Sequence, residues 1–390
     1  MSHALHRHPH FTSRADPSSG IVSYCLTGSA APMVKGLYFQ TPSMQGDSSL
    51  LWFRVLYPPA KQACLAAVRL DADQPDMRTY PEAVMAGNPL IAADGEGAWV
   101  PIDDGIHWRP FDGSLETVFR MPTDVIANRH LFRVVTDLTL SCDGRWFVLD
   151  SHIGNRYLIS LVERETAAFT PLRWFPFNHH HAFFSPHDPD LFMVNHGPAF
   201  DPITGHKNDM NVRMWVMNTK LTRYEPVDPT LWFGRNSMGC HEWWTPDGKV
   251  NWCDYNDGIY EIDLDTRHKQ VIWPHPLVHG MVERTGRYYV GDQNPYHWNE
   301  QKPCSVWFFD RATGREVTIA ADLPRPPVEN RDFRAYHTDP HPHFSGDGRW
   351  VVYTTTAFGQ LSVALAAVEE ILPRLKQAGR QIVTGGGDGQ

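Results

Sequence analysis

The segment HTDPHPHFSGDGRW, residues 337–350, carries His337, Asp339, His341 and His343 at every second position. Alternate side chains of a β-strand point to the same face. A strand in this segment would therefore direct three imidazoles and one carboxylate to one side. Imidazole and carboxylate groups bind Mn²⁺, Zn²⁺ or Fe²⁺, and imidazole also exchanges protons near neutral pH. The spacing predicts a divalent-metal site or an acid–base site.

Histidines also accompany the turns of three earlier segments. NHHHAFFSP, with His179, His180 and His181, and VNHGP, with His196, lie on the two sides of the first of these turns. GCHEWW, with His241, precedes the second turn, and PLVHGM, with His279, precedes the third. Strand alternation predicts that His179 and His181 share a face.

The histidine segments belong to a phrase that recurs seven times along the chain. Each copy has a short lead-in, a turn and an apolar strand, and the turns centre on Gly46, Gly95, Gly144, Asp188, Gly248, Gly286 and Gly348. Glycine supplies the positive φ that tight hairpin turns need. A four-stranded sheet that recurs about every 40–50 residues is typical of β-propeller blades. We therefore expect an all-β, seven-bladed propeller; a six-bladed ring or an array of β-sandwiches is the alternative.

The propeller is expected to be a single domain over residues 21–380. A flexible, histidine-rich tail is predicted for residues 1–20, and a second flexible tail for residues 381–390. The segment LSVALAAVEEILPRLKQ predicts a short C-terminal helix over residues 361–377, interrupted by Pro373.

In a propeller the innermost strands surround a central channel, and ligands bind at one mouth. Histidines from successive blades would then be neighbours, so we expect His279, Asp339 and His341 to bind one metal ion, with His337 or His343 as a fourth ligand. Two arginines, Arg213 and Arg235, can bind a carboxylate through paired N–H groups. The sequence thus predicts a metal site beside an anion-binding site.

Composition narrows the class of ligand. The chain of 390 residues has a net charge of −9 and a pI near 6.1, with no basic stripe, which argues against nucleic acid as a partner. Its 21 histidines and 14 tryptophans favour a carbohydrate site. The first residues lack the apolar core of a signal peptide, and no apolar run has membrane-spanning length, so we expect a cytoplasmic protein. The six cysteines are scattered, so we expect them to be free thiols.

Several phrases together resemble the oligogalacturonate lyases, a family of seven-bladed polysaccharide lyases. These are HAFFSPHDPDLFMVNHGP, RMWVMN, HEWWTPDG, VHGMVERTGRYYVGD and DPHPHFSGDG, in this order over residues 175–356. The resemblance implies cleavage of short, acidic uronate oligosaccharides by β-elimination with a manganese-type ion. It implies catalytic roles for Arg213 and His241. We expect His181, His196 and Arg235 to bind the substrate.

The metal ligands depart from the family pattern of three histidines and a glutamine. His279 and His341 match two of the histidines, whereas Asp339 replaces the third and Tyr336 stands near the glutamine position. His337 is the expected substitute, and Mn²⁺ is the expected ion, with Zn²⁺ or Fe²⁺ as alternatives.

The division of catalytic work stays open at this point. The resemblance favours Arg213 as the base, while the pKa near ~6.5 of an ordinary imidazole favours His241. Two other functions also stay open: the same elimination on glucuronate-containing or ulvan-like oligomers, and a non-catalytic propeller that binds a sugar or a protein. The oligomeric state is not predicted.

Overall fold

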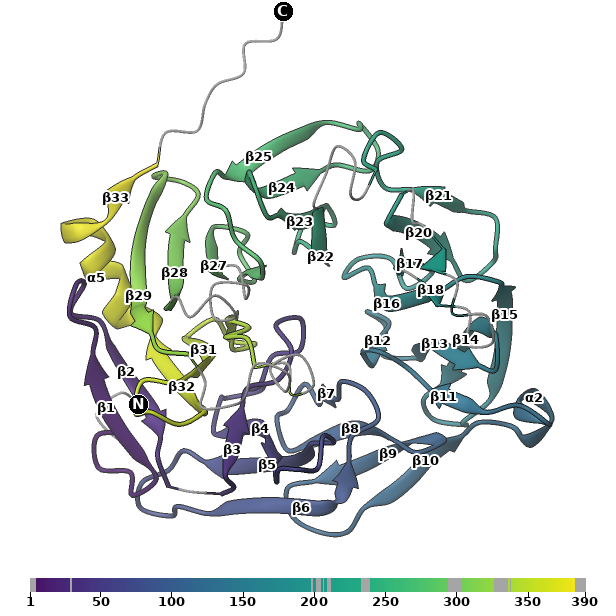
Figure 1. Cartoon of the computed structure of the whole chain (residues 1–390), viewed down its shortest axis with the longest axis horizontal. Coiled ribbons are helices and arrows are strands. Elements are labelled where there is room, and N and C mark those ends of the chain that lie inside the picture. The colour runs from purple at the N-terminus through teal and green to yellow at the C-terminus, as the bar shows by residue number, and fades with distance from the viewer. Residues whose placement is uncertain are drawn as a thin grey trace, which may run out of the picture.

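A computed structural model of the chain describes residues 5–28, 30–197, 199–200, 205, 207–208, 212–232, 239–293, 303–325, 336 and 338–382. In these residues, seven antiparallel sheets of four or five strands surround a central channel, and each sheet forms one blade (Figure 1). The predicted all-β, seven-bladed propeller is confirmed. None of the helices in the described part of the chain has the length and apolarity to cross a membrane.

The first three blades follow one another along the chain. Blade one consists of β3 (Met33–Lys35), β4 (Leu50–Leu56), β5 (Cys64–Arg69) and β6 (Met77–Val84). Blade two consists of β7 (Leu90–Ile91), β8 (Gly97–Ile102), β9 (Gly105–Pro110) and β10 (Glu116–Arg120). After the single-turn helix α2 (Thr123–Ile126), blade three consists of β11 (Leu131–Arg133), β12 (Thr139–Leu140), β13 (Trp146–Ile153), β14 (Arg156–Glu163) and β15 (Phe169–Phe175).

Blades four to six carry most of the histidine segments. Blade four consists of β16 (His179–Phe184), β17 (Leu191–His196), β20 (Met214–Asn218) and β21 (Tyr224–Pro226), with a separate pair of strands, β18 (Ala199–Phe200) and β19 (Lys207–Asn208). Blade five consists of β22 (Gly239–Trp244), β23 (Val250–Asp254), β24 (Gly258–Ile262) and β25 (Lys269–Trp273). Blade six consists of β26 (Gly280–Val282), β27 (Tyr288–Asp292), β28 (Cys304–Asp310), β29 (Arg315–Leu323) and β33 (Arg380–Gln381).

Blade seven joins the two ends of the chain. Its strands are β30 (His343–Phe344), β31 (Trp350–Thr355) and β32 (Ser362–Ala367), followed outward by β2 (Val22–Leu26) and β1 (Phe11–Ala15). Figure 1 shows purple N-terminal strands beside yellow C-terminal ones in this blade. Pairing such as Ser23 with Ala366 closes the ring by backbone hydrogen bonds between distant parts of the chain.

This closure corrects two expectations. The tail predicted for residues 1–20 is wrong from residue 5 on, because Leu5 is buried and β1 pairs with β2 along its whole length. The helix predicted for 361–377 is half wrong: residues 362–367 form strand β32, and only α5 (Val368–Ala378) is helical. β33 is paired with β29, whereas residues 383–390 of the second predicted tail lie outside the described residues.

The turns behave as the repeat predicted, with one exception. The turn glycines have positive φ, for example +83° at Gly248 and +73° at Gly348, and both of these amides donate to the carbonyl three residues earlier. In blade four Asp188 replaces the glycine, and the turn is held by its carbonyl, which accepts from the Leu191 amide at 3.2 Å.

The core consists of apolar clusters between neighbouring blades rather than one central core. Val290 and Phe308 of blade six, for instance, pack with Tyr353 of blade seven, and Ile371 and Leu375 of α5 cover the same cluster. All six cysteines are free thiols, as expected. Because adjacent blades are fused by these clusters, the inner strands are held at fixed positions around the channel.

Candidate active site

One residue of each blade occupies the same position relative to its turn. Seven residues before each turn centre stand Phe39, Asn88, Asp137, His181, His241, His279 and His341. Several neighbours in this series contact one another in space, among them Asn88 with Asp137 and Asp137 with His181. The rings of His241 and His279 are 4.1 Å apart and those of His279 and His341 are 4.3 Å apart, centre to centre. The histidines of successive blades therefore meet at the channel, as the sequence predicted.

Three of these histidines owe their direction to an unusual backbone conformation. His181, His241 and His341 have φ of +51°, +56° and +47°. In blades four and five the pairing of the first two strands shifts register around this residue. Such bulges redirect a side chain, and positive φ is uncommon for residues other than glycine. Strained backbone of this kind is concentrated at functional sites.

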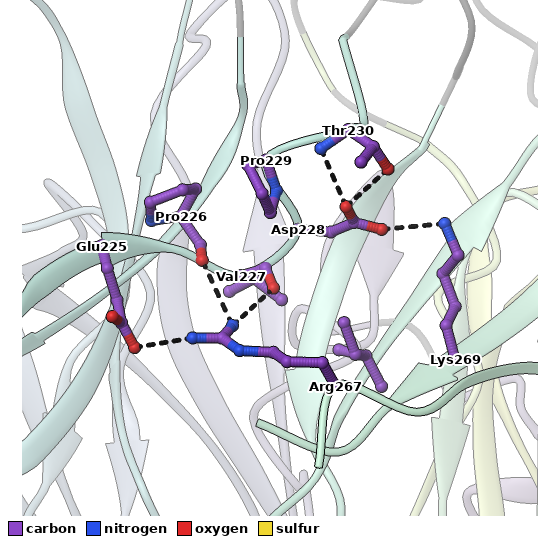
Figure 2. A pocket seen from close by; sticks show the side chains of 9 residues that line it. Glu225, Pro226, Val227, Asp228, Pro229, Thr230, Arg267 and Lys269 are labelled. Atoms are coloured by element: carbon purple, nitrogen blue, oxygen red, sulfur yellow. Dashed lines mark hydrogen bonds and ion pairs between the residues drawn. The ribbon is translucent and has the colours of Figure 1, made fainter. Parts of the chain in front are cut away.

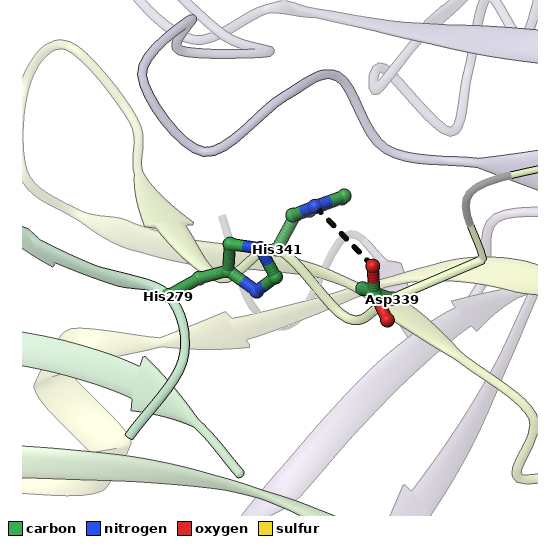
Figure 3. Close-up of side chains that lie close together, drawn as sticks. All are labelled: His279, Asp339 and His341. Atoms are coloured by element: carbon green, nitrogen blue, oxygen red, sulfur yellow. Dashed lines mark ion pairs between the residues drawn. The ribbon is translucent and has the colours of Figure 1, made fainter. Parts of the chain in front are cut away.

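His279, Asp339 and His341 form the candidate metal site (Figure 3). One ligand atom from each lies within 4.8 Å of the others, and all three side chains are buried. Two nitrogens and a carboxylate oxygen suit Mn²⁺, Zn²⁺ or Fe²⁺. The residues present therefore fit a divalent cation, and three of the predicted ligands, including the substituted Asp339, are brought together.

Asp292, which the sequence interpretation did not select, holds this site in place. Its carboxylate accepts from His279 Nδ1 at 3.0 Å and from the backbone amide of His341 at 3.0 Å. A carboxylate on one imidazole nitrogen fixes the ring and leaves the other nitrogen for a metal. The Asp292 charge also raises the pKa of His279, although burial alone would lower it.

The remaining predicted ligands do not join the three. His343 begins β30, and its Nε2 accepts from the Ser43 amide at 3.1 Å, so the expected single strand face from 337 to 343 is wrong. His337 lies outside the described residues. Tyr336, which stands near the expected glutamine position, packs against Met33 and Leu56 in a hydrophobic cluster.

Lys35 places a buried amine next to the metal site. Its Nζ donates to the Tyr336 carbonyl at 2.5 Å, and its charge acts on Asp339. Burial lowers the pKa of Lys35 to about 7, and the nearby Arg54 adds to this effect. Burial likewise raises the pKa of Asp339 to about 6, while the positive charge of His279 opposes the rise.

Arg213 and Glu242 form a buried ion pair beside these histidines. Arg213 Nε and Nη2 donate to the two Glu242 oxygens at 3.0 and 3.2 Å. Burial would lower the pKa of Arg213, but the Glu242 carboxylate reverses this and raises the pKa above its ordinary value. The guanidinium therefore keeps its proton.

His241 lies between this ion pair and the metal site. Its Nδ1 donates to the Val278 carbonyl at 2.7 Å, so Nε2 carries the lone pair. Burial lowers the pKa of His241 well below its ordinary value, and the charges of His279 and Arg213 lower it further. The ring is therefore neutral, with an unprotonated Nε2.

Aromatic side chains of the loop after β3 form the floor of the site. The Phe39 ring lies 5.9 Å from His241 and 5.5 Å from His279, and the Tyr38 ring lies 5.0 Å from His341. Both rings are buried. The seven-residue spacing before the turn, had it been applied to every blade, would have selected Phe39 and Asp137 from the sequence.

Blade four contributes one of its predicted histidines to the channel. His181 hydrogen-bonds Asp137 and stacks on Tyr38 with ring centres 5.7 Å apart. His179 instead faces the side of the blade, where Tyr224 Oη lies 3.2 Å from its Nε2. The expectation that His179 and His181 share a face is wrong, because the bulge interrupts the alternation.

The other two predicted substrate ligands are not brought to this group. His196 stacks on Trp215 at 4.9 Å and lies 3.0 Å from Tyr224 Oη, within the aromatic cluster at the side of blade four. Arg235 lies outside the described residues.

A separate surface pocket between blades four and five has a volume of about 540 Å³ (Figure 2). Its cations are already paired: Arg267 bonds Glu225 at 2.8 Å, and Lys269 bonds Asp228 at 2.8 Å. The charges of this pocket therefore neutralise one another, and the channel is the better candidate for an acidic ligand.

Comparison with known proteins supports the resemblance that the motifs indicated. The chain is 26% identical over 207 residues to the oligogalacturonide lyase of Pectobacterium atrosepticum; the match covers 49% of this chain and 50% of that protein. The chain thus spans about half the length of the curated relative it matches. No family model matches the chain.

Two solved structures share the fold over almost the whole chain. An oligogalacturonate lyase in complex with manganese matches with a TM-score of 0.72 and 18% identity, and covers 92% of this chain and 96% of its own. The oligogalacturonate lyase of Vibrio parahaemolyticus matches with a TM-score of 0.69 and 15% identity over the same shares. These similarities agree with the seven-bladed architecture described above.

Proposed function

We propose that this chain is a lyase that cleaves short uronic-acid oligosaccharides of the oligogalacturonate type by β-elimination. The observation that carries the proposal is the convergence of a metal-binding set, a neutral histidine and a charged arginine at one place in the channel. The His241 ring lies 4.1 Å from that of the metal ligand His279, and the Arg213 charge acts directly on His241. The similar lyases support the substrate class.

Elimination requires removal of the proton on C5 of a uronate and departure of the oxygen on C4. The ionised carboxylate on C5 makes this proton very weakly acidic, so negative charge that develops there must be stabilised. A Mn²⁺ ion held by His279, Asp339 and His341 would supply that stabilisation as a Lewis acid.

Arg213 is assigned to the substrate carboxylate. Two of its N–H groups are used by Glu242, which leaves three that point elsewhere. A guanidinium binds a carboxylate through paired hydrogen bonds. Because Glu242 holds Arg213 in place and keeps it protonated, Arg213 is better suited to bind and orient the uronate than to remove a proton.

His241 is assigned as the proton acceptor. Its Nδ1 hydrogen is directed to Val278, so its Nε2 is free of hydrogen and available to take the C5 proton. General base catalysis of this kind contributes about 10²- to 10⁴-fold to a rate. This assignment reverses the roles that the family resemblance implied.

An ultraviolet assay tests the function. Elimination creates a C4=C5 double bond conjugated to the carboxylate, which absorbs without added reagents. We expect absorbance to rise with digalacturonate or trigalacturonate, to stop with a chelator and to return with Mn²⁺. A rise only with glucuronate-containing or ulvan-type oligomers would keep the reaction and change the substrate. Silence on all of them, with Mn²⁺, Zn²⁺ and Fe²⁺ supplied in turn, would contradict a lyase and favour a binding propeller.

Chemical rescue tests the division of labour. His241→Gly should lose activity and regain part of it with added imidazole, because imidazole can enter the space and accept the proton. Arg213→Gly should regain activity with guanidinium and should show a raised KM. Rescue of Arg213→Gly by a neutral amine base, without a change in KM, would instead make Arg213 the base.

A further inference from the structure

A buried hydrogen-bonded chain runs from blade one to the channel. Asp137 is almost fully buried, and its carboxylate accepts from His181 Nδ1 and from Asn88 Nδ2. The Asn88 oxygen in turn accepts from Arg54. Both of these partners donate to the Asp137 carboxylate. Within this hydrogen-bonded series, His181 is the residue that faces the channel.

His181 lies beside the proposed base, on the side away from the metal site. Their positions belong to neighbouring blades, four and five, whereas His279 and His341 belong to blades six and seven. Tyr38 stacks on His181 and also contacts His341, so its ring separates the Asp137–His181 pair from the metal ligands. The proposed base is therefore flanked by a metal site and by a histidine–carboxylate pair.

Two carboxylates lie near the His181 ring. Asp137 contacts it directly, and the buried Asp150 lies close enough for its charge to interact with His181. Other titratable groups near it are His180, with ring centres 4.4 Å apart, His241 and Tyr38. Two carboxylates thus face His181, and neither of the neighbouring histidines carries a stable charge, since the pKa of each is lowered by burial.

Elimination needs a proton donor as well as a base. The departing C4 oxygen of a sugar leaves as a strongly basic alkoxide unless it is protonated. C4 and C5 are bonded to each other, so the donor must stand close to the base. The uronate carboxylate projects from C5, so the donor should lie on the side of the base opposite the carboxylate-binding metal site. His181 satisfies both conditions.

We propose that His181, positioned by Asp137, is the general acid that protonates the departing C4 oxygen; the inference rests on the lyase function proposed above. The C5–H bond breaks and its proton passes to His241 Nε2, while the bonding pair forms the C4=C5 double bond. The C4–O bond breaks with its electron pair on oxygen, which takes the proton from His181 Nε2. Solvent then returns a proton to His181 and removes one from His241.

The dependence of kcat on the leaving group tests whether His181 acts as the general acid. The probes are trigalacturonate, whose leaving group needs a proton, and a galacturonide that carries a 4-nitrophenoxy group at C4, which departs without one. His181→Gln should lower kcat on trigalacturonate about 10²- to 10⁴-fold and change kcat on the nitrophenoxy compound less than about 10-fold. Asp137→Asn should show the same difference between the two probes, with a smaller loss of kcat on trigalacturonate.

A matched control exists in the same chain. His275 pairs with Glu316 at 2.9 Å, but His275 follows the outer strand β25 of blade five and Glu316 lies on β29 of blade six. His275→Gln should leave both rates unchanged. Equal losses on both probes in His181→Gln, or an unchanged kcat on trigalacturonate in Asp137→Asn, would overturn the role of the pair. Failure of the wild type to eliminate any uronate would instead overturn the proposed function and this inference with it.

Discussion

Arg213 and Glu242 lie on neighbouring blades and are joined by two hydrogen bonds of 3.0 and 3.2 Å in a buried setting. Arg213 stands just before β20, the third strand of blade four, and Glu242 lies on β22, the first strand of blade five. The pair fixes the relative position of two blades and, under the function proposed above, orients the guanidinium for a uronate carboxylate.

Substitution of Glu242 tests the effect of the ion pair on stability and on activity. Glu242→Gln leaves the Arg213 charge buried without a counter-charge, which costs about 3 to 5 kcal/mol of unfolding free energy. We also expect kcat/KM on uronates to fall, because the guanidinium is no longer held. Thermal unfolding and the ultraviolet assay measure the two effects. Asp104→Asn, which breaks the exposed pair with Arg120, is the control and should change neither. An unchanged melting temperature in Glu242→Gln would contradict the importance of the pair.

Asp292 provides a test of the metal site that does not remove a ligand. Asp292→Asn should weaken Mn²⁺ binding about 10- to 100-fold, because a carboxylate that orients a ligating imidazole contributes to metal affinity. Titration calorimetry with MnCl₂ measures the affinity directly and needs no substrate. Asp150 is the matched control: its carboxylate also accepts backbone amides of two adjacent blades, from Thr136 and Ala182, but it holds none of the three ligands. Equal affinity in wild type and Asp292→Asn would contradict this role.

The blade number could be predicted from the sequence because each turn imposes a local requirement. A tight turn with positive φ selects glycine, and six of the seven turns carry it, so the repeat is visible in single letters. The ring closure could not be predicted in this way. β2 pairs with β32, more than 300 residues later, and nothing in the sequence of either strand specifies its partner.

The candidate site was predictable in residue type but only partly in geometry. Asp339 and His341 converge with His279, yet the strand that was expected to align them with His343 begins only at His343 itself. Positive φ sets the direction of His341, and register shifts accompany positive φ at His181 and His241. Such features depend on tertiary packing rather than on local alternation. Asp137 was missed because no other candidate residue stands beside it in the sequence. It contacts His181 only because blades three and four are neighbours in the fold.

Acid should destabilise the fold through the histidine cluster of blade four. Burial lowers the pKa of His196 to about 4 from 6.5, and that of His179 to about 2. A histidine with a lowered pKa binds fewer protons when folded, so its contribution to stability is complete above pH 6.5 and is lost as the pH falls towards 4. For His196 the 2.5-unit difference corresponds to about 3 kcal/mol.

The measurement is the unfolding free energy from urea titrations between pH 7 and 4. His196→Gln should flatten this profile, whatever its effect at neutral pH, because the titrating group is gone. His268→Gln, at an exposed position, should keep the wild-type slope. Parallel profiles for wild type and His196→Gln would show that this histidine is not held neutral in the folded chain.

Closure of the ring by the N-terminal strands predicts that a core substitution there is as costly as one within a blade. Tyr24 on β2 is fully buried, meets Trp350 of β31 edge to face at 6.3 Å and lies within hydrogen-bonding distance of His6 at 3.0 Å. Tyr24→Ala should therefore lower the unfolding free energy by about 3 to 5 kcal/mol, as large-to-small changes of buried aromatic residues do. Phe358, an aromatic residue of the same blade that is 45% exposed, is the control. If the two alanine variants melt at the same temperature, the N-terminal strands are not a structural part of blade seven, and the residues before the first blade would regain the role of a dispensable tail.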